Sequence, residues 1–178
     1  MTIAMPKPDS QVLEGRDTFL AELAGLVPGD NLISDQVGLK AYECDALSAY
    51  RTLPLAVVLP ETTQEVSDVM QACLAHKVKV VPRGSGTGLS GGALPLEDGV
   101  LLGLGKFNRI LEIDYPNRCA TVQPGVTNLS ISQAVSDAGF YYAPDPSSQI
   151  ACSIGGNVAE NSGGVQCLKY GVTTNNLL

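Results

Sequence analysis

The sequence is poor in residues that several common protein chemistries require. Its 178 residues include no tryptophan and one histidine, His76, and the five cysteines contain no CxxC pair. An odd number of cysteines without that spacing fits neither a zinc ribbon, an iron–sulfur cluster nor a disulfide framework. We therefore expect all five, at positions 44, 73, 119, 152 and 167, to be reduced core residues.

Positive charge and long apolar runs are also scarce. Eleven Lys and Arg stand against 18 Asp and Glu, a net charge of -7, which argues against nucleic acid or an anionic membrane as the main partner because both select basic surfaces. No apolar stretch approaches the roughly 20 residues of a membrane span, and the first residues lack the pattern of a signal peptide. We expect a cytoplasmic protein that holds any bound anion through local groups.

The first half of the chain predicts one helix and one parallel strand pair. After a flexible lead-in over residues 1–14, helical spacing of apolar residues predicts a short helix over 17–27. An apolar strand over 55–59, a helix capped by Thr62 and a second apolar strand over 78–81 form a βαβ unit, with both strands parallel and buried on both faces. One face of that helix should carry Val66, Val69, Met70, Cys73 and Leu74.

The second half has a different pattern. A strand is expected over 100–104, followed by an antiparallel hairpin of 110–114 and 120–123 and a helix over 127–138 that ends at Gly139. Residues 143–164 are expected to form a long loop with little regular structure. The chain as a whole thus predicts an α+β protein of two small lobes, one parallel and one largely antiparallel.

A glycine-rich loop, PRGSGTGLSGG at 82–92, follows the second parallel strand. It contains GxGxxG and GxSxG by chance: the first needs a helix that Gly92 and Pro95 forbid, and the second needs a later histidine, whereas His76 precedes Ser90. Alternating glycines can instead turn successive N–H groups inward, as phosphate oxygens require. A surface turn is the simpler alternative, but it needs only one or two glycines.

A second set of glycines lies at 155, 156, 163 and 164, close to Asn157 and Asn161. Side-chain amides at such a loop can read the edge of a polar ring. Two glycine-rich loops together indicate a long ligand that has both phosphates and a flat polar ring.

Four runs carry a resemblance to a known family: YECDALSAYR at 42–51, RGSGTGLSGGALPL at 83–96, VQPGV at 122–126 and YYAPDPSSQIACSIGGNVAEN at 141–161. They resemble the FAD-binding domain of the vanillyl-alcohol oxidase family (FAD-linked oxidases, PCMH-type), and within it the glycolate oxidase branch. The resemblance implies a lead-in and helix over 1–41, a first FAD-binding lobe over 42–96 and an incomplete second lobe over 97–178.

The resemblance also implies which residues meet the cofactor. Those expected at the pyrophosphate are Arg83, Gly84, Ser85, Gly86, Thr87 and Gly88, and those expected at a turn beside it are Pro124 and Gly125. Those expected on the other lobe are Pro144, Asp145, Ser148, Ser153, Ile154, Gly155, Gly156, Asn161, Gly163 and Gly164. No His lies in either loop, and Cys152 occupies a position without a tethering role in this branch, so noncovalent FAD is expected.

The chemistry implied is that of a flavin-dependent 2-hydroxy-acid dehydrogenase or oxidase, with glycolate or D-lactate as substrate and a hydride passing to flavin N5. Family members bind the substrate in a later domain, so no catalytic or metal residue is expected in this fragment. Other glycolate oxidase subunits, including an iron–sulfur subunit, are implied as partners and could hold the protein at the inner membrane. Two alternatives stay open, a noncatalytic FAD-binding or assembly subunit and a nucleotide-sugar reductase of the same fold.

Overall fold

The structure is a computed structural model that describes residues 5–178, arranged in two compact units. Unit 1 contains the described residues up to Arg83 and also Gly88–Leu104, whereas unit 2 contains Gly84–Thr87 and Gly105–Leu178. The glycine-rich loop therefore contributes residues to both units. The units divide after Leu104, whereas the sequence predicted a lobe boundary at 96/97.

Unit 1 is built on a sheet of four strands in the order β1-β2-β4-β3. Strand β4 pairs in parallel with both β2 and β3, and β1 pairs antiparallel with β2. The strand expected in the second lobe is thus the central β4 of this sheet, which corrects that prediction. The bounds are β1 (Leu32–Ile33), β2 (Ala56–Val58), β3 (Lys79–Arg83) and β4 (Gly99–Gly103).

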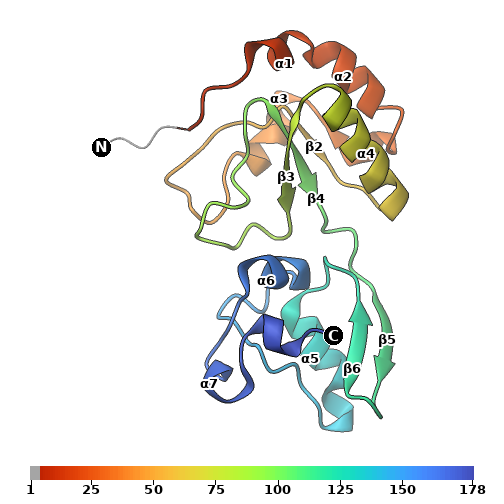
Figure 1. Cartoon of the computed structure of the whole chain (residues 1–178), viewed down its shortest axis with the longest axis vertical. Helices are drawn as coiled ribbons and strands as arrows, with labels where there is room; N and C mark the ends of the chain where they lie inside the picture. Colours follow the sequence, from red (N-terminus) through yellow and green to blue (C-terminus); the bar gives the residue numbers. More distant parts are fainter. Residues whose placement is uncertain (1–4) are drawn as a thin grey trace. The chain divides into compact units, whose positions relative to one another are not determined.

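Alternation along the two inner strands decides which residues face which helix. Ala56 and Val58 of β2 pack with Val100 and Leu102 of β4 in the larger core, and the intervening Val57 and Leu101 form a smaller core on the other face. Two helices, α2 (Arg16–Leu23) and α4 (Thr63–Ala75), lie side by side along the first face (Figure 1). A short helix, α3 (Gln36–Leu39), adds Leu39 to the second.

The two strands and the helix of the predicted βαβ unit are confirmed, but the prediction of which residues are buried is partly wrong. Thr62 caps α4 by accepting a hydrogen bond from the Glu65 N–H. The helix buries Val69, Ala72 and Cys73, whereas the predicted face residues Met70 and Leu74 are exposed. Strand β3 is an edge strand in which Val81 is buried and Lys79 and Pro82 are exposed, instead of being buried on both faces.

The N-terminal segment is more ordered than the sequence predicted. A helix, α1 (Ser10–Glu14), precedes α2, so the expected flexible lead-in is wrong over residues 10–14, while residues 1–4 lie outside the described part of the chain. The buried Asp98 carboxylate holds this segment by accepting a hydrogen bond from the Asp9 N–H at 2.8 Å. The same carboxylate oxygen accepts a hydrogen bond from Lys79 Nζ of β3 at 2.6 Å. Burial by itself would raise the pKa of Asp98, but these two donors lower it below its usual value.

Unit 2 contains the predicted hairpin and the predicted helix. Strands β5 (Ile110–Asp114) and β6 (Cys119–Val122) pair antiparallel, and α5 (Asn128–Val135) continues as a 3-10 turn (Ser136–Ala138) that ends at Gly139 with φ 78°. Val126, Ile131 and Ile154 form its small apolar core. Both predictions are confirmed.

The long loop expected over 143–164 is wrong in one part. Residues Ile154–Glu160 form helix α6, capped by Ser153, and α7 (Cys167–Tyr170) and a 3-10 turn (Thr173–Asn176) follow. Glycines at 155 and 156 are poor helix formers, and this concealed α6 in the sequence.

The cysteines are all free thiols. Cys73 and Cys152 are buried, and burial raises the pKa of the Cys73 thiol to about 11. Cys44 and Cys119 are half-buried and Cys167 is exposed, so the expectation that all five are core residues is confirmed only at Cys73 and Cys152. Among residues 5–178, no helix has the length and apolarity needed to cross a membrane.

Candidate functional site

The glycine-rich loop leaves β3 and carries a run of backbone donors that the protein does not use. Within the described residues, the N–H groups of Ser85, Gly86, Thr87 and Gly88 donate no hydrogen bond. Gly86 has a φ of 66°, a left-handed conformation that favours glycine and turns consecutive peptides toward one side. We call Ser85–Gly88 the nest.

The start of α6 offers no such donors. Ile154 and Gly155 donate their N–H groups to the carbonyls of Val126 and Pro124, each at 2.8 Å. The next two N–H groups of the helix are bonded to Ser153, through its hydroxyl at 3.3 Å and its carbonyl at 3.0 Å. Because all four first-turn amides have protein partners, a ligand anion would find its backbone donors in the nest and not in the helix.

Backbone packing within unit 2 brings the loop and α6 together. A Cβ added to Gly84 would overlap the Ser153 hydroxyl, and one added to Gly155 would lie 2.7 Å from Pro124 Cβ. Glycine is therefore required at both positions by contacts within the protein, whatever else binds there. These contacts place Gly84, Pro124 and Ser153–Gly156, which the sequence analysis assigned to two different loops, in one neighbourhood.

The remaining residues predicted for the second loop support the loop itself. Gly164 packs so tightly on Asp145 that a Cβ would overlap the Asp145 carbonyl and carboxylate, and Gly163 faces Val172 and Cys167. Asn161 ends α6 in a left-handed conformation, and its Oδ1 accepts the Thr174 N–H at 3.0 Å.

Backbone groups of the other predicted residues also have partners within the protein. The Pro144 carbonyl accepts a hydrogen bond from Asn128 Nδ2, and the Ser148 carbonyl accepts one from the Cys152 N–H. Gly125 donates its N–H to the Phe107 carbonyl at 2.7 Å.

Two buried asparagines in unit 2 keep polar atoms without a partner. Asn128 Oδ1 and Asn157 Nδ2 make no hydrogen bond in the described part of the chain, although both residues are at most 2% exposed. Such atoms are costly unless water or a ligand satisfies them. The sequence analysis singled out Asn157 as a possible ring reader but missed Asn128, which gives no signal in the sequence beyond being polar at the start of a helix.

The Arg83 side chain is held within unit 1. Its Nη1 donates to the Cys44 carbonyl at 2.8 Å, and its guanidinium lies 5.8 Å from the centre of the Tyr42 ring. All three residues belong to unit 1. That Arg83 is a phosphate ligand stays a prediction, and its contacts in this structure are with Cys44 and Tyr42.

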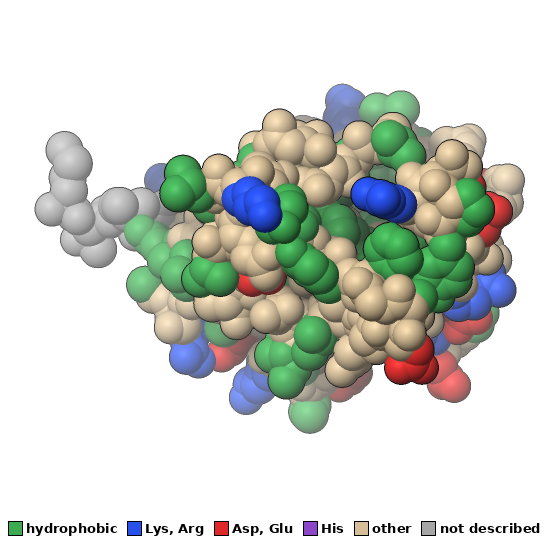
Figure 2. Space-filling view, turned by 90° about the horizontal axis from the view of Figure 1, so that it is seen from below, with side chains coloured by type: hydrophobic (Ala, Val, Ile, Leu, Met, Phe, Trp, Pro, Cys, Tyr) green, Lys and Arg blue, Asp and Glu red, His purple; other side chains and the backbone are tan. Residues whose placement is uncertain are grey.

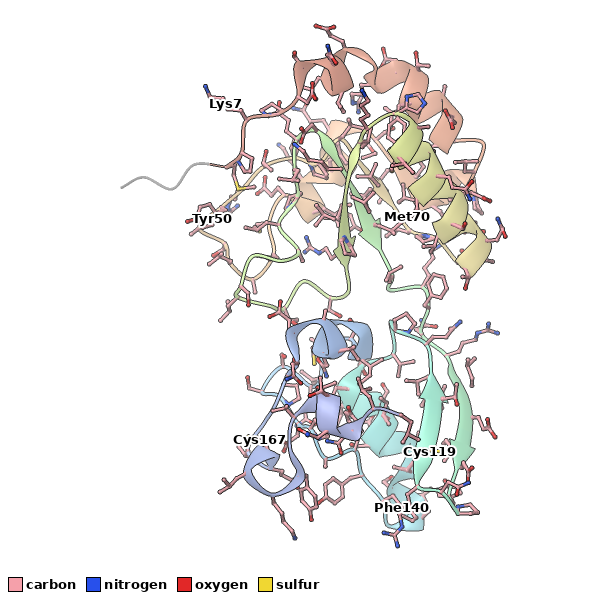
Figure 3. The ribbon with its side chains drawn as sticks, viewed as in Figure 1. Lys7, Tyr50, Met70, Cys119, Phe140 and Cys167 are labelled. Atoms are coloured by element: carbon pink, nitrogen blue, oxygen red, sulfur yellow. The ribbon has the colours of Figure 1, made fainter. Side chains whose placement is uncertain are left out.

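A separate cleft occupies the far end of the hairpin and α5 and contains none of the predicted site residues. Its walls are mostly apolar and aromatic, with Asp114 and Arg118 also among the lining residues, and they include Cys119 of β6 and Phe140 beyond α5, both labelled in Figure 3. Hydrophobic side chains gather on the surface seen from below in Figure 2. The cleft offers no group of acids, bases or backbone donors comparable to the nest.

A profile of the FAD binding domain family matches residues 54–178, more than half of the chain. The chain belongs to this family. FAD is therefore the cofactor of the domain, and the fold agrees with the PCMH-type resemblance carried by the two glycine-rich loops. The N-terminal helices α1 and α2 lie outside the matched residues.

The chain is similar to curated proteins that carry three different enzyme names. The chain is 59% identical over 163 residues to glycolate oxidase subunit GlcD of Escherichia coli, covering 92% of this chain and 33% of that protein. It is 36% identical to D-2-hydroxyglutarate dehydrogenase of Stutzerimonas stutzeri, covering 88% and 34%, and 36% identical to D-lactate dehydrogenase of Anaerostipes hadrus, covering 83% and 31%. The chain thus spans about a third of the length of these relatives.

Solved structures share the fold. The chain superposes on an alkyldihydroxyacetonephosphate synthase with a TM-score of 0.79 at 23% identity, covering 96% of this chain and 33% of the other. It superposes on p-cresol methylhydroxylase with a TM-score of 0.72 at 23% identity, covering 84% and 30%. Both matches confirm the predicted α+β architecture, since this level of identity shows the fold alone.

Proposed function

We propose that the nest binds the pyrophosphate of FAD. The observation that carries the proposal is the run of four amides, Ser85–Gly88, without a protein acceptor within residues 5–178. Uncharged donors concentrated at one loop suit a protein with a net charge of -7, because they bind an anion without a basic surface. The residues of the nest therefore fit the phosphate part of FAD.

The fit extends to the second loop. Ser153 and Gly156 lie beside Gly84, and Gly155 packs on Pro124. Together with Ile154, these residues would form the wall next to the pyrophosphate. The unpartnered Nδ2 of Asn157 is a donor of the kind that a flavin carbonyl or ring nitrogen accepts. Pro144 would shape this wall through its bond to α5, and Asp145 and Gly164 through their contact with each other. Ser148, Asn161 and Gly163 would shape it through contacts with Cys152, Thr174 and Val172.

Binding is proposed to be noncovalent. No histidine lies in either glycine-rich loop, and Cys152, the cysteine within the second loop, is 4% exposed and packed in the interior of unit 2. FAD held only by hydrogen bonds and packing should be removable from the folded chain by dilution or dialysis.

The protein of which this chain is a part is proposed to oxidise a 2-hydroxy acid. The names of the relatives point to glycolate, D-lactate and D-2-hydroxyglutarate, which share a hydroxyl on the carbon next to a carboxylate. FAD, when held by these residues, would supply the acceptor for a hydride from that carbon. The residues of this chain would hold and orient the cofactor, and no residue here is proposed as the base.

The names of the relatives also support a proposal about partner subunits. One relative is named as a subunit of glycolate oxidase, so we propose that the parent protein works with other subunits, an iron–sulfur subunit among them. Such subunits could place a cytoplasmic protein at the inner membrane.

The test is a titration of the chain with FAD, followed by quenching of flavin fluorescence, with FMN as the matched ligand that lacks the pyrophosphate bridge. Gly86→Val should abolish FAD binding because a β-branched residue rarely adopts φ 66°. Gly139→Val is the matched control, since Gly139 has φ 78° with open space around it and lies far from the nest in the sequence. Equal loss in both variants, or equal binding of FMN, would refute the proposal.

A further inference from the structure

The segment Tyr42–Thr52, which we call the brace, is an irregular loop closed on itself. Its ends are joined by the Thr52 N–H, which donates to the Glu43 carbonyl at 2.9 Å, and by Arg51 Nη1, which donates to Glu43 Oε1 at 2.7 Å. The carboxylate of Asp45, 7% exposed, accepts the Leu47 N–H at 2.8 Å. These bonds fix the shape of a segment that has almost no regular secondary structure.

The brace holds Arg83, two residues before the nest. The Cys44 carbonyl accepts from Arg83 Nη1, and the Tyr42 ring lies against the Arg83 guanidinium. Tyr42 itself packs on the smaller core of unit 1, formed by Leu39, Val57 and Leu101. Arg83 is thereby fixed at two points to the interior of unit 1 through the brace.

The brace also contacts the chain shortly after the nest. A Cβ built on Gly91, which has φ 80°, would lie 3.2 Å from Leu94 Cδ1 and 3.4 Å from Leu47 Cδ2, so the Leu47 side chain lies beside the backbone of Gly91. Both sides of the glycine-rich loop, at Arg83 and at Gly91, therefore rest on the same segment. The nest lies between these two contacts.

We propose that the brace presets the spacing of the nest, and that Arg83 is a positioning residue that acts through Cys44 and Tyr42 and not as a counter-ion for phosphate. The inference rests on the proposed pyrophosphate site. A loop held at both ends loses less conformational freedom when it closes on an anion, and this raises affinity without any contact between the brace and the ligand.

The first test compares FAD affinity in Tyr42→Leu, Arg83→Lys and the double variant, with Tyr115→Leu as a matched tyrosine control on the hairpin turn. Arg83→Lys keeps the charge but loses the planar fork that bonds the carbonyl and stacks on the ring. We expect each single variant to weaken FAD about tenfold and the double variant to be no worse than either, because they break one clamp.

Arg83→Gln separates the two roles. If Arg83 pairs with phosphate, Tyr42→Leu and Arg83→Lys leave FAD affinity unchanged, and Arg83→Gln weakens it and reduces its dependence on salt. That pattern would overturn the proposal. A positioning role predicts the opposite: an effect of Tyr42→Leu and an unchanged salt dependence in Arg83→Gln.

The second test needs no cofactor. Trypsin cuts after arginine, and the clamp should protect the Arg83–Gly84 bond, so in Tyr42→Leu its cleavage should rise about tenfold relative to cleavage after the exposed Arg118. An unchanged ratio in the folded variant would overturn the brace, even if the wild-type chain fails to bind FAD. Failure of the wild-type chain to bind FAD, with the protease result as expected, would instead refute the proposed function and leave the brace in place.

Discussion

The interiors of the two units differ in the kinds of side chain that they bury. Unit 1 buries aliphatic side chains, with Val57, Val58, Val100 and Leu101 wholly inaccessible on two adjacent strands. Among the described residues, unit 2 has a smaller apolar core and buries four polar residues, Asn128, Ser153, Asn157 and Thr173, whereas unit 1 buries Asn31, Asp45 and Asp98 beside a larger apolar core. The interior of unit 1 thus consists mainly of packed aliphatic side chains, while buried polar side chains make up a larger part of the interior of unit 2.

The difference extends to the backbone. In unit 1 the parallel strands satisfy one another, whereas in unit 2 glycines allow segments to touch where no side chain fits, as between Gly155 and Pro124. The nest follows the edge strand β3, at the carboxyl end where sheets of this kind expose donors and ligands bind. The sheet therefore fixes where the loop after β3 begins, and the glycines of unit 2 allow backbone segments to approach each other closely.

The largest expected effect is on the scaffold. Leu101→Ala on the central strand should destabilise the chain by about 3 kcal/mol, because it removes a fully buried side chain and leaves a cavity. Denaturant unfolding monitored by circular dichroism measures it. Leu89→Ala, at a residue 71% exposed, is the control and should change stability by less than about 0.5 kcal/mol. Similar losses in both variants would contradict the account of unit 1.

A smaller effect is expected where backbones meet in unit 2. Gly155→Ala places a Cβ 2.7 Å from Pro124 Cβ and 3.0 Å from the Pro124 carbonyl oxygen, so the helix start must shift at a cost of about 1–3 kcal/mol. Gly105→Ala is the matched control, since nothing lies within 4 Å of its added Cβ. The same denaturation measurement applies. A stabilised Gly155→Ala variant would show that the close packing of α6 on Pro124 is not a constraint.

The smallest effect concerns pH and the N-terminal helices. Because the folded pKa of Asp98 is lowered, its contribution to stability is fully present above the unfolded pKa of about 3.9 and is lost as pH falls through the folded pKa. Asp98→Asn should cost about 1 kcal/mol at neutral pH, since Lys79 is half exposed and its bond is partly screened. Melting curves at pH 7 and pH 3 should show a smaller difference between variant and wild type at pH 3. An equal difference at both values would mean that the carboxylate charge is not involved.

Local patterns predicted most of the elements but not how they assemble. Apolar runs located β2, β3 and β4, and Thr62 and Gly139 marked the ends of α4 and α5. Pairing is a long-range property, so nothing near residue 100 indicated that β4 inserts between β2 and β3. Helix α6 was hidden because its stability comes from the Ser153 cap and from bonds to residues 124–126, not from helix propensity.

For the candidate site too, the sequence predicted local features but not contacts between distant residues. The glycine pattern predicted a loop rich in free amides, and the unused N–H groups of Ser85–Gly88 agree with it. It did not show that Gly84, Gly155 and Gly164 are glycines because of contacts within the protein, nor that Arg83 turns toward Cys44. Those facts depend on neighbours more than 35 residues away for Arg83 and Gly84, and sequence spacing carries no information about them.

The central claim is that the nest, and not the start of α6, supplies the backbone donors for the pyrophosphate. The most direct measurement is a two-dimensional NMR titration of the ¹⁵N-labelled chain with FAD, following individual amide protons. We expect the amide protons of Ser85, Gly86, Thr87 and Gly88 to move downfield as they gain acceptors, while those of Ile154–Asn157, which already have partners, move little. Downfield shifts confined to Ile154–Asn157, with the nest unaffected, would contradict the account.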